Sequence, residues 1–230
     1  MKNLLCLLLA LGVMLVSFSS VPAADQSVNI KLPKPVLTGK LSVEAAMLTK
    51  KCMRNFSSAP LTAAQVSQIL WAANGNLPTD AITGATCKVF PSAGGLYPLE
   101  AFLVSGQNTV EGIPAGVYRY NSVDNSLNQV TPGDNRKLLA AAALSQMFIA
   151  QAPAVVVVAA VFERMTGKYG PRGMNYVFME AGMANQNIFL QAESLGLKVA
   201  SVGAFQDAQV AAALKLPAGV SPLLVIPVGK

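Results

Sequence analysis

Two adjacent glycines occur in the segment Pro91-Ser92-Ala93-Gly94-Gly95-Leu96-Tyr97-Pro98-Leu99-Glu100, just before an apolar run at residues 101–104. Glycine ahead of a strand allows a positive φ or a close approach of the backbone to another group. The amides of such a loop could face a planar or anionic ligand. An ordinary turn, which proline, serine and glycine all favour, is the alternative on local sequence alone.

A basic cluster surrounds a cysteine earlier in the chain. Lys50, Lys51 and Arg54 flank Cys52. Lys50 and Arg54 are four residues apart, so a helical turn would bring both side chains to one face. Such a pair could bind a phosphate through charge-assisted hydrogen bonds. The alternative is a solvated helix end, where basic side chains offset the helix dipole.

Three further candidate sites lie in the second half of the chain. Lys168 and Tyr169 precede a long helical pattern, and a desolvated lysine there could act as a base or could simply stand in a polar loop. Gly203 and Ala204 could present backbone amides to a ligand or belong to an ordinary helix-to-strand connection. Lys230, the last residue, could reach a phosphate or form a frayed end.

The amino-acid composition excludes several kinds of catalytic and metal-binding site. The chain of 230 residues contains no histidine, which excludes Ser-His-Asp catalysis and histidine metal sites. Its three cysteines are too few for a zinc cluster once Cys6 is assigned to a leader, so no metal site is expected. The net charge is +6, but outside residues 50–54 the basic residues are scattered. We therefore expect one anion-binding point and no nucleic-acid partner.

The N-terminus has the features of a signal peptide. A basic Lys2 precedes an apolar core at residues 4–16, and Val21-Pro22-Ala23 offers small residues for cleavage. We expect residues 1–23 to be removed after Ala23 and the chain to be exported, into the periplasm; a retained anchor is the alternative. In an oxidising compartment Cys52 and Cys87 could form a disulfide or remain two separate thiols, and we favour the thiols.

The remaining pattern predicts an extended arm over residues 24–40 and a single domain over residues 41–230. Hydrophobic periodicity and capping patterns predict helices over residues 42–51, 62–74, 134–146, 174–195 and 207–214. Strands are expected over residues 101–104, 116–121, 127–130, 153–162, 199–205 and 223–228. Helices interspersed with strand pairs, one of them a hairpin, favour an α+β fold.

Five segments together resemble one protein family. The decapeptide at residues 91–100 closely resembles Pro-Ser-Ala-Gly-Ala-Leu-Tyr-Pro-Leu-Glu of SagB-type flavin dehydrogenases, a branch of the nitroreductase family. Residues 50–62 resemble that family's Arg-Arg-Ser-x-Arg-x-Phe followed by Pro-Leu-Ser/Thr. Residues 168–172 resemble the family's Lys-Tyr-Gly-x-Arg, and residues 196–205 resemble its Gly-Leu-Gly-x-x-x-x-Gly-Ala-Phe. Residues 227–229 resemble its Pro-Val-Gly ending. The matches follow the family order over about residues 48–230.

The resemblance implies a nitroreductase-like α+β fold, with a central, mainly antiparallel sheet flanked by helices. It implies FMN as the cofactor and a homodimer with flavin at the subunit interface. By position, the phosphate and ribityl chain of the cofactor would be held by Lys50, Lys51, Cys52, Arg54 and Lys230. The loop that would run along the flavin ring is Pro91, Ser92, Ala93, Gly94 and Gly95. Backbone amides would be presented to the N5 edge of the ring by Gly203 and Ala204.

The expected function is that of an exported FMN-dependent oxidoreductase. It would transfer hydride between flavin N5 and a small organic substrate, with nitroaromatic or quinone-like acceptors as the family's typical partners. One alternative is a SagB-type dehydrogenase of azoline-like heterocycles, with Lys168 and Tyr169 as catalytic residues. Another is a non-catalytic binding domain, because Cys52 and Met183 replace the family's usual serine and histidine. The sequence names no electron donor.

Overall fold

A computed structural model describes residues 28–79, 84 and 86–230. The expected signal peptide over residues 1–23 and the first residues of the expected arm lie outside these ranges. Within the described part of the chain, no helix is both long and apolar enough to cross a membrane.

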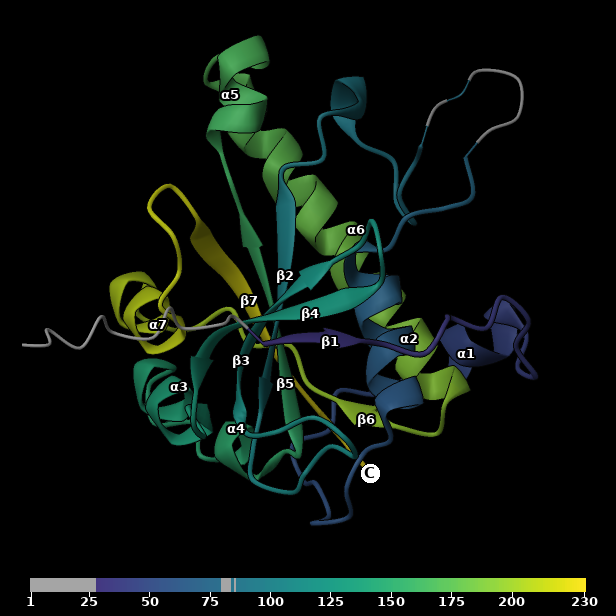
Figure 1. Ribbon diagram of the computed structural model, residues 1–230. Helices are drawn as coiled ribbons and strands as arrows, with labels where there is room; N and C mark the ends of the chain where they lie inside the picture. Colours follow the sequence, from purple (N-terminus) through teal and green to yellow (C-terminus); the bar gives the residue numbers. More distant parts are fainter. Residues whose placement is uncertain (1–27, 80–83, 85) are drawn as a thin grey trace, which may run out of the picture.

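The centre of the molecule is a seven-stranded sheet in the order β1-β4-β3-β2-β5-β7-β6, in which every neighbouring pair is antiparallel (Figure 1). This confirms the predicted fold class and the predicted hairpin between residues 116–121 and 127–130. The strands are β1 (Asn29–Lys31), β2 (Leu99–Ser105), β3 (Gly116–Asn121), β4 (Ser126–Pro132), β5 (Ala154–Ala160), β6 (Lys198–Val199) and β7 (Ser221–Gly229).

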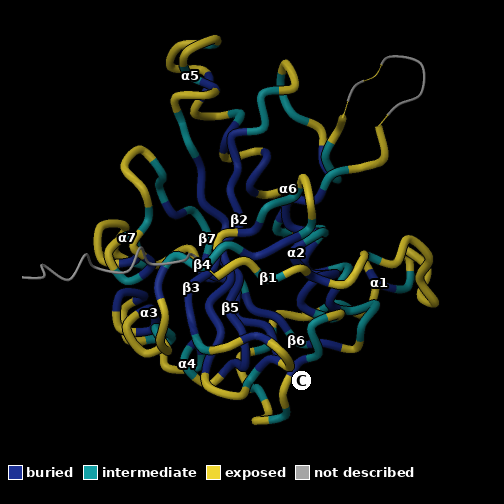
Figure 2. Tube along the Cα trace, in the orientation of Figure 1, coloured by how far each residue is buried: buried dark blue, intermediate teal, exposed yellow. Residues whose placement is uncertain are grey.

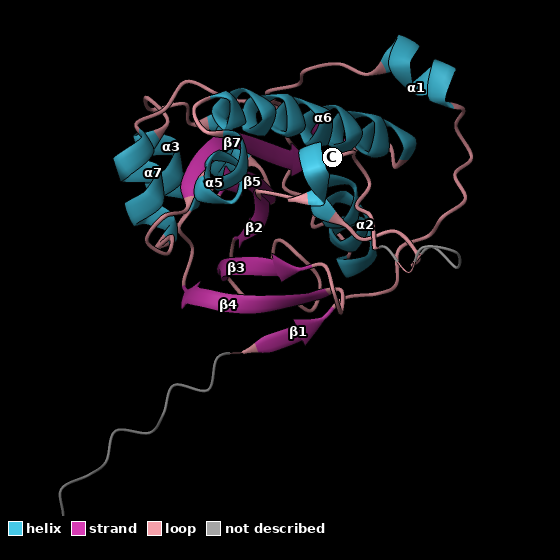
Figure 3. Cartoon of the chain, turned by 90° about the horizontal axis from the view of Figure 1, so that it is seen from above, coloured by secondary structure: helices cyan, strands magenta, loops and turns pink. Residues whose placement is uncertain are grey.

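Helices cover both faces of the sheet (Figure 3). One hydrophobic cluster joins α2 and α6 to one face, and a second joins α3, α4 and α7 to the other. The helices are α1 (Val43–Thr49), α2 (Ala63–Asn74), α3 (Arg136–Ala142), α4 (Phe148–Gln151), α5 (Glu163–Tyr169), α6 (Arg172–Ser194) and α7 (Asp207–Leu214), with a 3-10 turn at Ala93–Gly95.

Burial follows from this layering. Every residue of β2 and β5 is buried, because helices cover both sides of these central strands (Figure 2). Successive side chains of a strand point to opposite faces. Accordingly, Leu103 packs in the cluster with α2 and α6, whereas Phe102 packs in the cluster with α3 and α7.

Local signals set the helix starts. The Ser42 side chain accepts from the backbone N–H of Ala45, and Thr62 forms a capping box with Gln65, as the sequence predicts.

Three predicted elements need correction. The first helix ends at Thr49 rather than at residue 51, because Lys50 adopts an extended ψ of 136°. The helix expected over residues 134–146 stops at Ala142, and positive φ values at Leu144 and Ser145 separate it from α4.

The strand expected over residues 199–205 is only β6 plus a bridge at Val202. Opposite Ala200 stands Pro227, which has no N–H to donate to an edge strand. Strand β1 and helix α5 are additional elements that the sequence pattern did not predict.

Candidate functional site

A first group of predicted cofactor residues gathers at the β6 edge of the sheet. Cys52 forms a parallel bridge with Val199, and the Met53 N–H donates to Val199 O over 2.8 Å. The residues from Lys50 onward therefore do not continue helix α1, and the helical turn predicted to align Lys50 with Arg54 is absent. The Arg54 guanidinium instead lies 5.6 Å from the centroid of the Phe148 ring.

The end of the chain and the segment after β6 join this group. Lys230 Nζ donates to Pro60 O over 2.8 Å, and Lys230 O accepts from the Ser57 N–H over 2.8 Å, so the last residue is tied down. Gln146 Nε2 donates to Ala204 O over 3.1 Å. Since Gln146 and Phe148 flank the start of α4, this end of the helix contacts both Arg54 and Ala204.

The amides of Gly203 and Ala204 donate to no backbone acceptor among the described residues, so both could serve a ligand. A Cβ placed on Gly203 would meet nothing within 4 Å. The backbone here is therefore open to close approach, as a planar ring requires.

A second group forms around the glycine loop, residues 91–97. Gly94 and Gly95 have φ of 63° and 66°, the left-handed region that glycine adopts readily. A Cβ on Gly94 would lie 2.6 Å from Tyr169 Oη and 2.9 Å from Lys168 Nζ. The structure thus brings the glycine loop together with Lys168 and Tyr169, which lie at the end of α5 rather than in a loop.

Glu180 of helix α6 anchors the glycine loop, and sequence reasoning missed it. Its Oε1 accepts from Ser92 Oγ over 2.8 Å and from the Ala93 N–H over 3.2 Å. Glu180 is 2% exposed, and burial raises the pKa of its carboxyl, while the hydrogen bonds from Ser92 and Ala93 act in the opposite direction. An acidic residue within the apolar stripe of a helix was the signal that could have found it.

The two groups lie toward opposite ends of the central strands, separated along the strand direction. The glycine loop leads into Leu99, which pairs with Ala160, and Ala160 pairs with Ser221 at the start of β7. Lys198 pairs with Gly229 at the other end of β7. Eight residue steps of a strand span about 27 Å. In Figure 1 the chain end marked C and helix α5 stand at opposite ends of the molecule.

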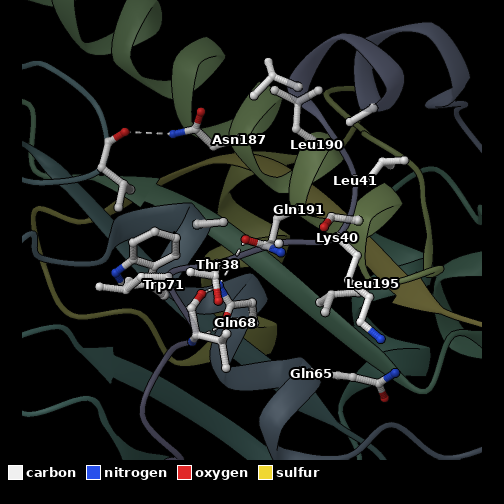
Figure 4. A pocket seen from close by; sticks show the side chains of 18 of the residues that line it. Thr38, Lys40, Leu41, Gln65, Gln68, Trp71, Asn187, Leu190, Gln191 and Leu195 are labelled. Atoms are coloured by element: carbon white, nitrogen blue, oxygen red, sulfur yellow. Dashed lines mark hydrogen bonds between the residues drawn. The ribbon is translucent and has the colours of Figure 1, made fainter.

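A cavity of about 570 Å³ lies elsewhere, between residues 36–43, α2 and α6 (Figure 4). Gln68 joins its walls: its Oε1 accepts from the Val36 N–H over 2.8 Å, and its Nε2 donates to Val36 O and to Gln191 Oε1. Trp71 and Leu195 also line it. None of the predicted cofactor or catalytic residues lines this cavity.

The two cysteines in the described part of the chain are free thiols. Cys52 and Cys87 are both exposed and unpaired. Of the two arrangements left open by the sequence, the structure has the separate thiols.

Comparison with known proteins matches this architecture. The family model described as "Nitroreductase family" matches residues 48–230. A protein of Methanocaldococcus jannaschii described as a nitroreductase is 40% identical over 191 residues, which cover 83% of this chain and 92% of that protein. A crystal structure from Ralstonia eutropha JMP134, also described as a nitroreductase, superposes with a TM-score of 0.73 at 26% identity, covering 88% of this chain and 89% of that one.

A second relative supports the SagB-type resemblance. The microcin B17-processing protein McbC of Escherichia coli is 31% identical over 146 residues, covering 62% of this chain and 54% of McbC. This likeness, the shared fold and the family match together confirm the resemblance drawn from the motifs. The chain belongs to the nitroreductase family, and it is an oxidoreductase of the SagB-type branch.

Proposed function

We propose that the chain is an FMN-dependent oxidoreductase that transfers hydride between flavin N5 and a small organic substrate, and that two copies of the chain complete each flavin site. One observation carries the proposal. The residues matched to the phosphate and the glycine loop matched to the face of the ring belong to two groups separated by about the length of β7, roughly 27 Å, and Gly203 and Ala204, matched to the ring edge, lie with the first group. A second copy of the chain can supply the missing half.

Each group suits its part of the cofactor. Lys50, Arg54 and Lys230 supply cations for a phosphate near one end of β7. The glycine loop has an open backbone, held by Glu180, against which a flat ring can lie. Gly203 and Ala204 offer free amides to a ring edge that gains charge on reduction. When bound, the flavin supplies the hydride chemistry, and these residues hold it and orient it.

An exposed apolar stripe on α6 supports association of two copies. Met174, Phe178, Met179 and Met183 are each between 40% and 53% exposed. Several large exposed apolar side chains on one helix commonly mark a protein interface. The stripe lies on the same helix as Glu180, so a partner packed there would come close to the glycine loop.

The first test is the cofactor itself. The purified protein is expected to be yellow and to release FMN on denaturation. Protein that is colourless and fails to bind added FMN would overturn the flavin assignment.

The second test separates a shared site from a single-chain site. Arg54→Ala weakens the phosphate half, and Gly94→Ala inserts a Cβ against Tyr169 and Lys168. Each variant alone is expected to lose FMN. Mixed dimers of the two variants would hold one intact site, formed by the undamaged half of each chain, and would regain about half of the wild-type FMN content.

Two control variants accompany this mixture. Gly112→Ala imposes the same kind of backbone strain at a φ of 71° in open space, and Lys137→Ala removes an exposed charge on α3. Both are expected to retain FMN. If co-refolded Arg54→Ala and Gly94→Ala chains form mixed dimers without regaining FMN, the two-copy site is wrong.

The azoline-dehydrogenase alternative has one specific observation in its favour. Lys168 Nζ and Tyr169 Oη both approach Gly94, the position matched to the flavin ring. A base at this place could take a proton from a substrate that loses hydride to the ring. Lys168→Ala is expected to abolish oxidation of such a substrate and to spare reduction of artificial acceptors. Equal loss of both activities would reject the base role.

Export remains a proposal based on residues 1–23. Expression of the whole chain with its native start is expected to yield a mature protein beginning at Ala24. N-terminal sequencing checks this, and recovery of an intact Met1 end in the membrane fraction would instead support the retained anchor.

A further inference from the structure

Helix α5, which carries Lys168 and Tyr169, has little buried surface of its own. It is seven residues long and stands beyond the upper ends of β2 and β5 in Figure 1. Met165 is its one buried residue. Isolated helices of this length are marginal in water, so contacts with the rest of the protein must set its position.

Arg164 fastens α5 to the glycine loop and to strand β2. Its Nη1 donates to Tyr97 O over 3.2 Å, and its Nη2 donates to Glu100 Oε1 over 2.6 Å. The planar guanidinium presents its donors in a fixed fork, so it can serve both acceptors at once. One side chain of α5 therefore contacts both the end of the loop and the strand that follows it.

The carboxylate of Glu100 is itself held in a fixed orientation. Its side chain is 9% exposed, and its Oε2 lies 2.9 Å from both Nε and Nη2 of Arg119 on β3. Charge-assisted hydrogen bonds to an arginine fork add geometric specificity as well as energy. Arg119 thus orients the carboxylate so that its other oxygen, Oε1, meets Arg164.

The catalytic candidates lie one helical turn beyond Arg164. Arg164 and Lys168 are four residues apart on α5, so they lie on the same face of the helix. A Cβ on Gly94 would lie 2.9 Å from Lys168 Nζ and 2.6 Å from Tyr169 Oη. Helix α5 therefore approaches the glycine loop at two places, with Arg164 at Tyr97 and with Lys168 and Tyr169 at Gly94.

We propose that Arg164 and Glu100 are positioning residues for the flavin site, because they hold α5 where Lys168 and Tyr169 stand beside Gly94. The inference rests on the proposed function, in which Gly94 is matched to the flavin ring. Both residues act through the position of α5. Breaking the pair removes the polar attachment of the helix, and Lys168 and Tyr169 then move away from the ring.

The fluorescence lifetime of FMN in the loaded protein tests this positioning. A tyrosine quenches flavin fluorescence only at close range, so a docked α5 gives a short lifetime and an undocked α5 gives a long one. Arg164→Gln is expected to lower the amplitude ratio of the short to the long component about tenfold, the effect of about one charge-assisted hydrogen bond. In a Tyr169→Phe background the same substitution is expected to leave the lifetimes unchanged, because the quencher is absent.

Arg136→Gln is the matched control. Arg136 also joins a carboxylate to a backbone carbonyl, since its Nη2 donates to Asp134 Oδ2 and its Nη1 donates to Ala152 O, each over 2.7 Å. It lies on α3, which packs on the other face of the sheet. Its loss is expected to lower the melting temperature without changing the lifetime ratio. A change of equal size in Arg136→Gln and Arg164→Gln would indicate general destabilisation and overturn the proposal.

Amide hydrogen exchange of the purified protein, with or without flavin, separates this proposal from the flavin assignment. Arg164→Gln is expected to speed exchange over residues 165–170 about tenfold, because the helix opens locally more often. Arg164→Lys keeps the charge but lacks the second nitrogen, so it is expected to have a smaller effect.

The possible failures are distinguishable. If the wild type binds no FMN, the proposed function fails, and the exchange data still decide whether Arg164 holds α5 against the glycine loop. Unchanged exchange in folded Arg164→Gln and Arg164→Lys overturns the proposal. Unchanged lifetimes in FMN-loaded Arg164→Gln overturn it as well, while the flavin assignment stands.

Discussion

Ser92 Oγ donates to Glu180 Oε1 over 2.8 Å, and this bond fastens the glycine loop to the long helix α6. The same hydroxyl accepts from the Tyr97 N–H over 2.9 Å, so one serine joins both ends of the loop to the helix. Tyr97 itself has a φ of 45°, an uncommon value for a residue with a side chain. The loop conformation therefore depends on a buried carboxylate about 90 residues away along the chain.

We expect Glu180→Leu to loosen the glycine loop. It removes the acceptor for Ser92 and Ala93, each worth about 1–3 kcal/mol when left unpaired. The expected result is faster amide hydrogen exchange over residues 92–97 and a lower FMN content. Glu180→Gln keeps an acceptor oxygen of the same reach and serves as the matched control. Unchanged exchange in Glu180→Leu would show that the loop holds its shape by other means.

Glu180 also gives a pH dependence with a definite sign. Burial raises its folded-state pKa above the ordinary carboxyl value of 4.5, so between these two pKa values the folded protein binds more protons than the unfolded chain. The free energy of unfolding should therefore fall as pH rises through that window. Denaturant titrations of the wild type and Glu180→Gln at several pH values check this. The variant lacks the titratable carboxyl, so its free energy of unfolding should fall less over the same pH window.

Lys88 should produce the opposite slope at alkaline pH. Burial is the main cause that lowers its pKa from 10.5 to about 8; Arg164 lowers it further and Glu100 raises it. Between these values the unfolded chain binds more protons, so the free energy of unfolding rises with pH. After allowance for partial exposure, we expect a rise of about 1 kcal/mol between pH 7.5 and 9.5. Lys88→Met should abolish it; an identical rise in this variant would assign the effect to another group.

The apolar stripe on α6 gives a prediction about assembly. Phe178 is 53% exposed and makes an edge contact with Phe162, with ring centroids 5.6 Å apart. Phe178→Glu places a charge in the proposed interface and should shift the protein to monomers, with loss of FMN. Leu138→Glu changes a 60% exposed leucine on α3, on the other face of the sheet, and should leave assembly intact. Light scattering after size exclusion separates the outcomes.

The sequence predicted most of the fold because its signals were local. The capping box at Thr62, the turn at Asn125 and the unbroken apolar run of β5 each depend on neighbouring residues. Strand β1 was missed because it is only three residues long and is specified by pairing with β4, about 100 residues later. The shortened edge at β6 likewise depends on a distant proline, Pro227.

The candidate site was predictable in its parts and not in its arrangement. Motif spelling located Arg54, Gly94 and Gly203, but spacing along the chain carries no information on which end of β7 each would reach. Glu180 and the pair of Arg164 with Glu100 depend on contacts between segments far apart in sequence. Such groups become visible only once the chain is folded.

The separation of the phosphate and ring residues along β7 has a consequence for how the amount of protein sets its activity. In the proposed two-copy site, a single chain provides the phosphate-binding residues of one flavin site and the ring-binding residues of the other, so alone it completes neither. Below the dissociation constant of the dimer, the number of complete sites then grows with the square of the chain concentration rather than in proportion to it. If two copies complete the site as proposed, flavin binding and dimerisation would be a single equilibrium, the cofactor would draw the subunits together, and doubling expression at low abundance would yield about four times the activity.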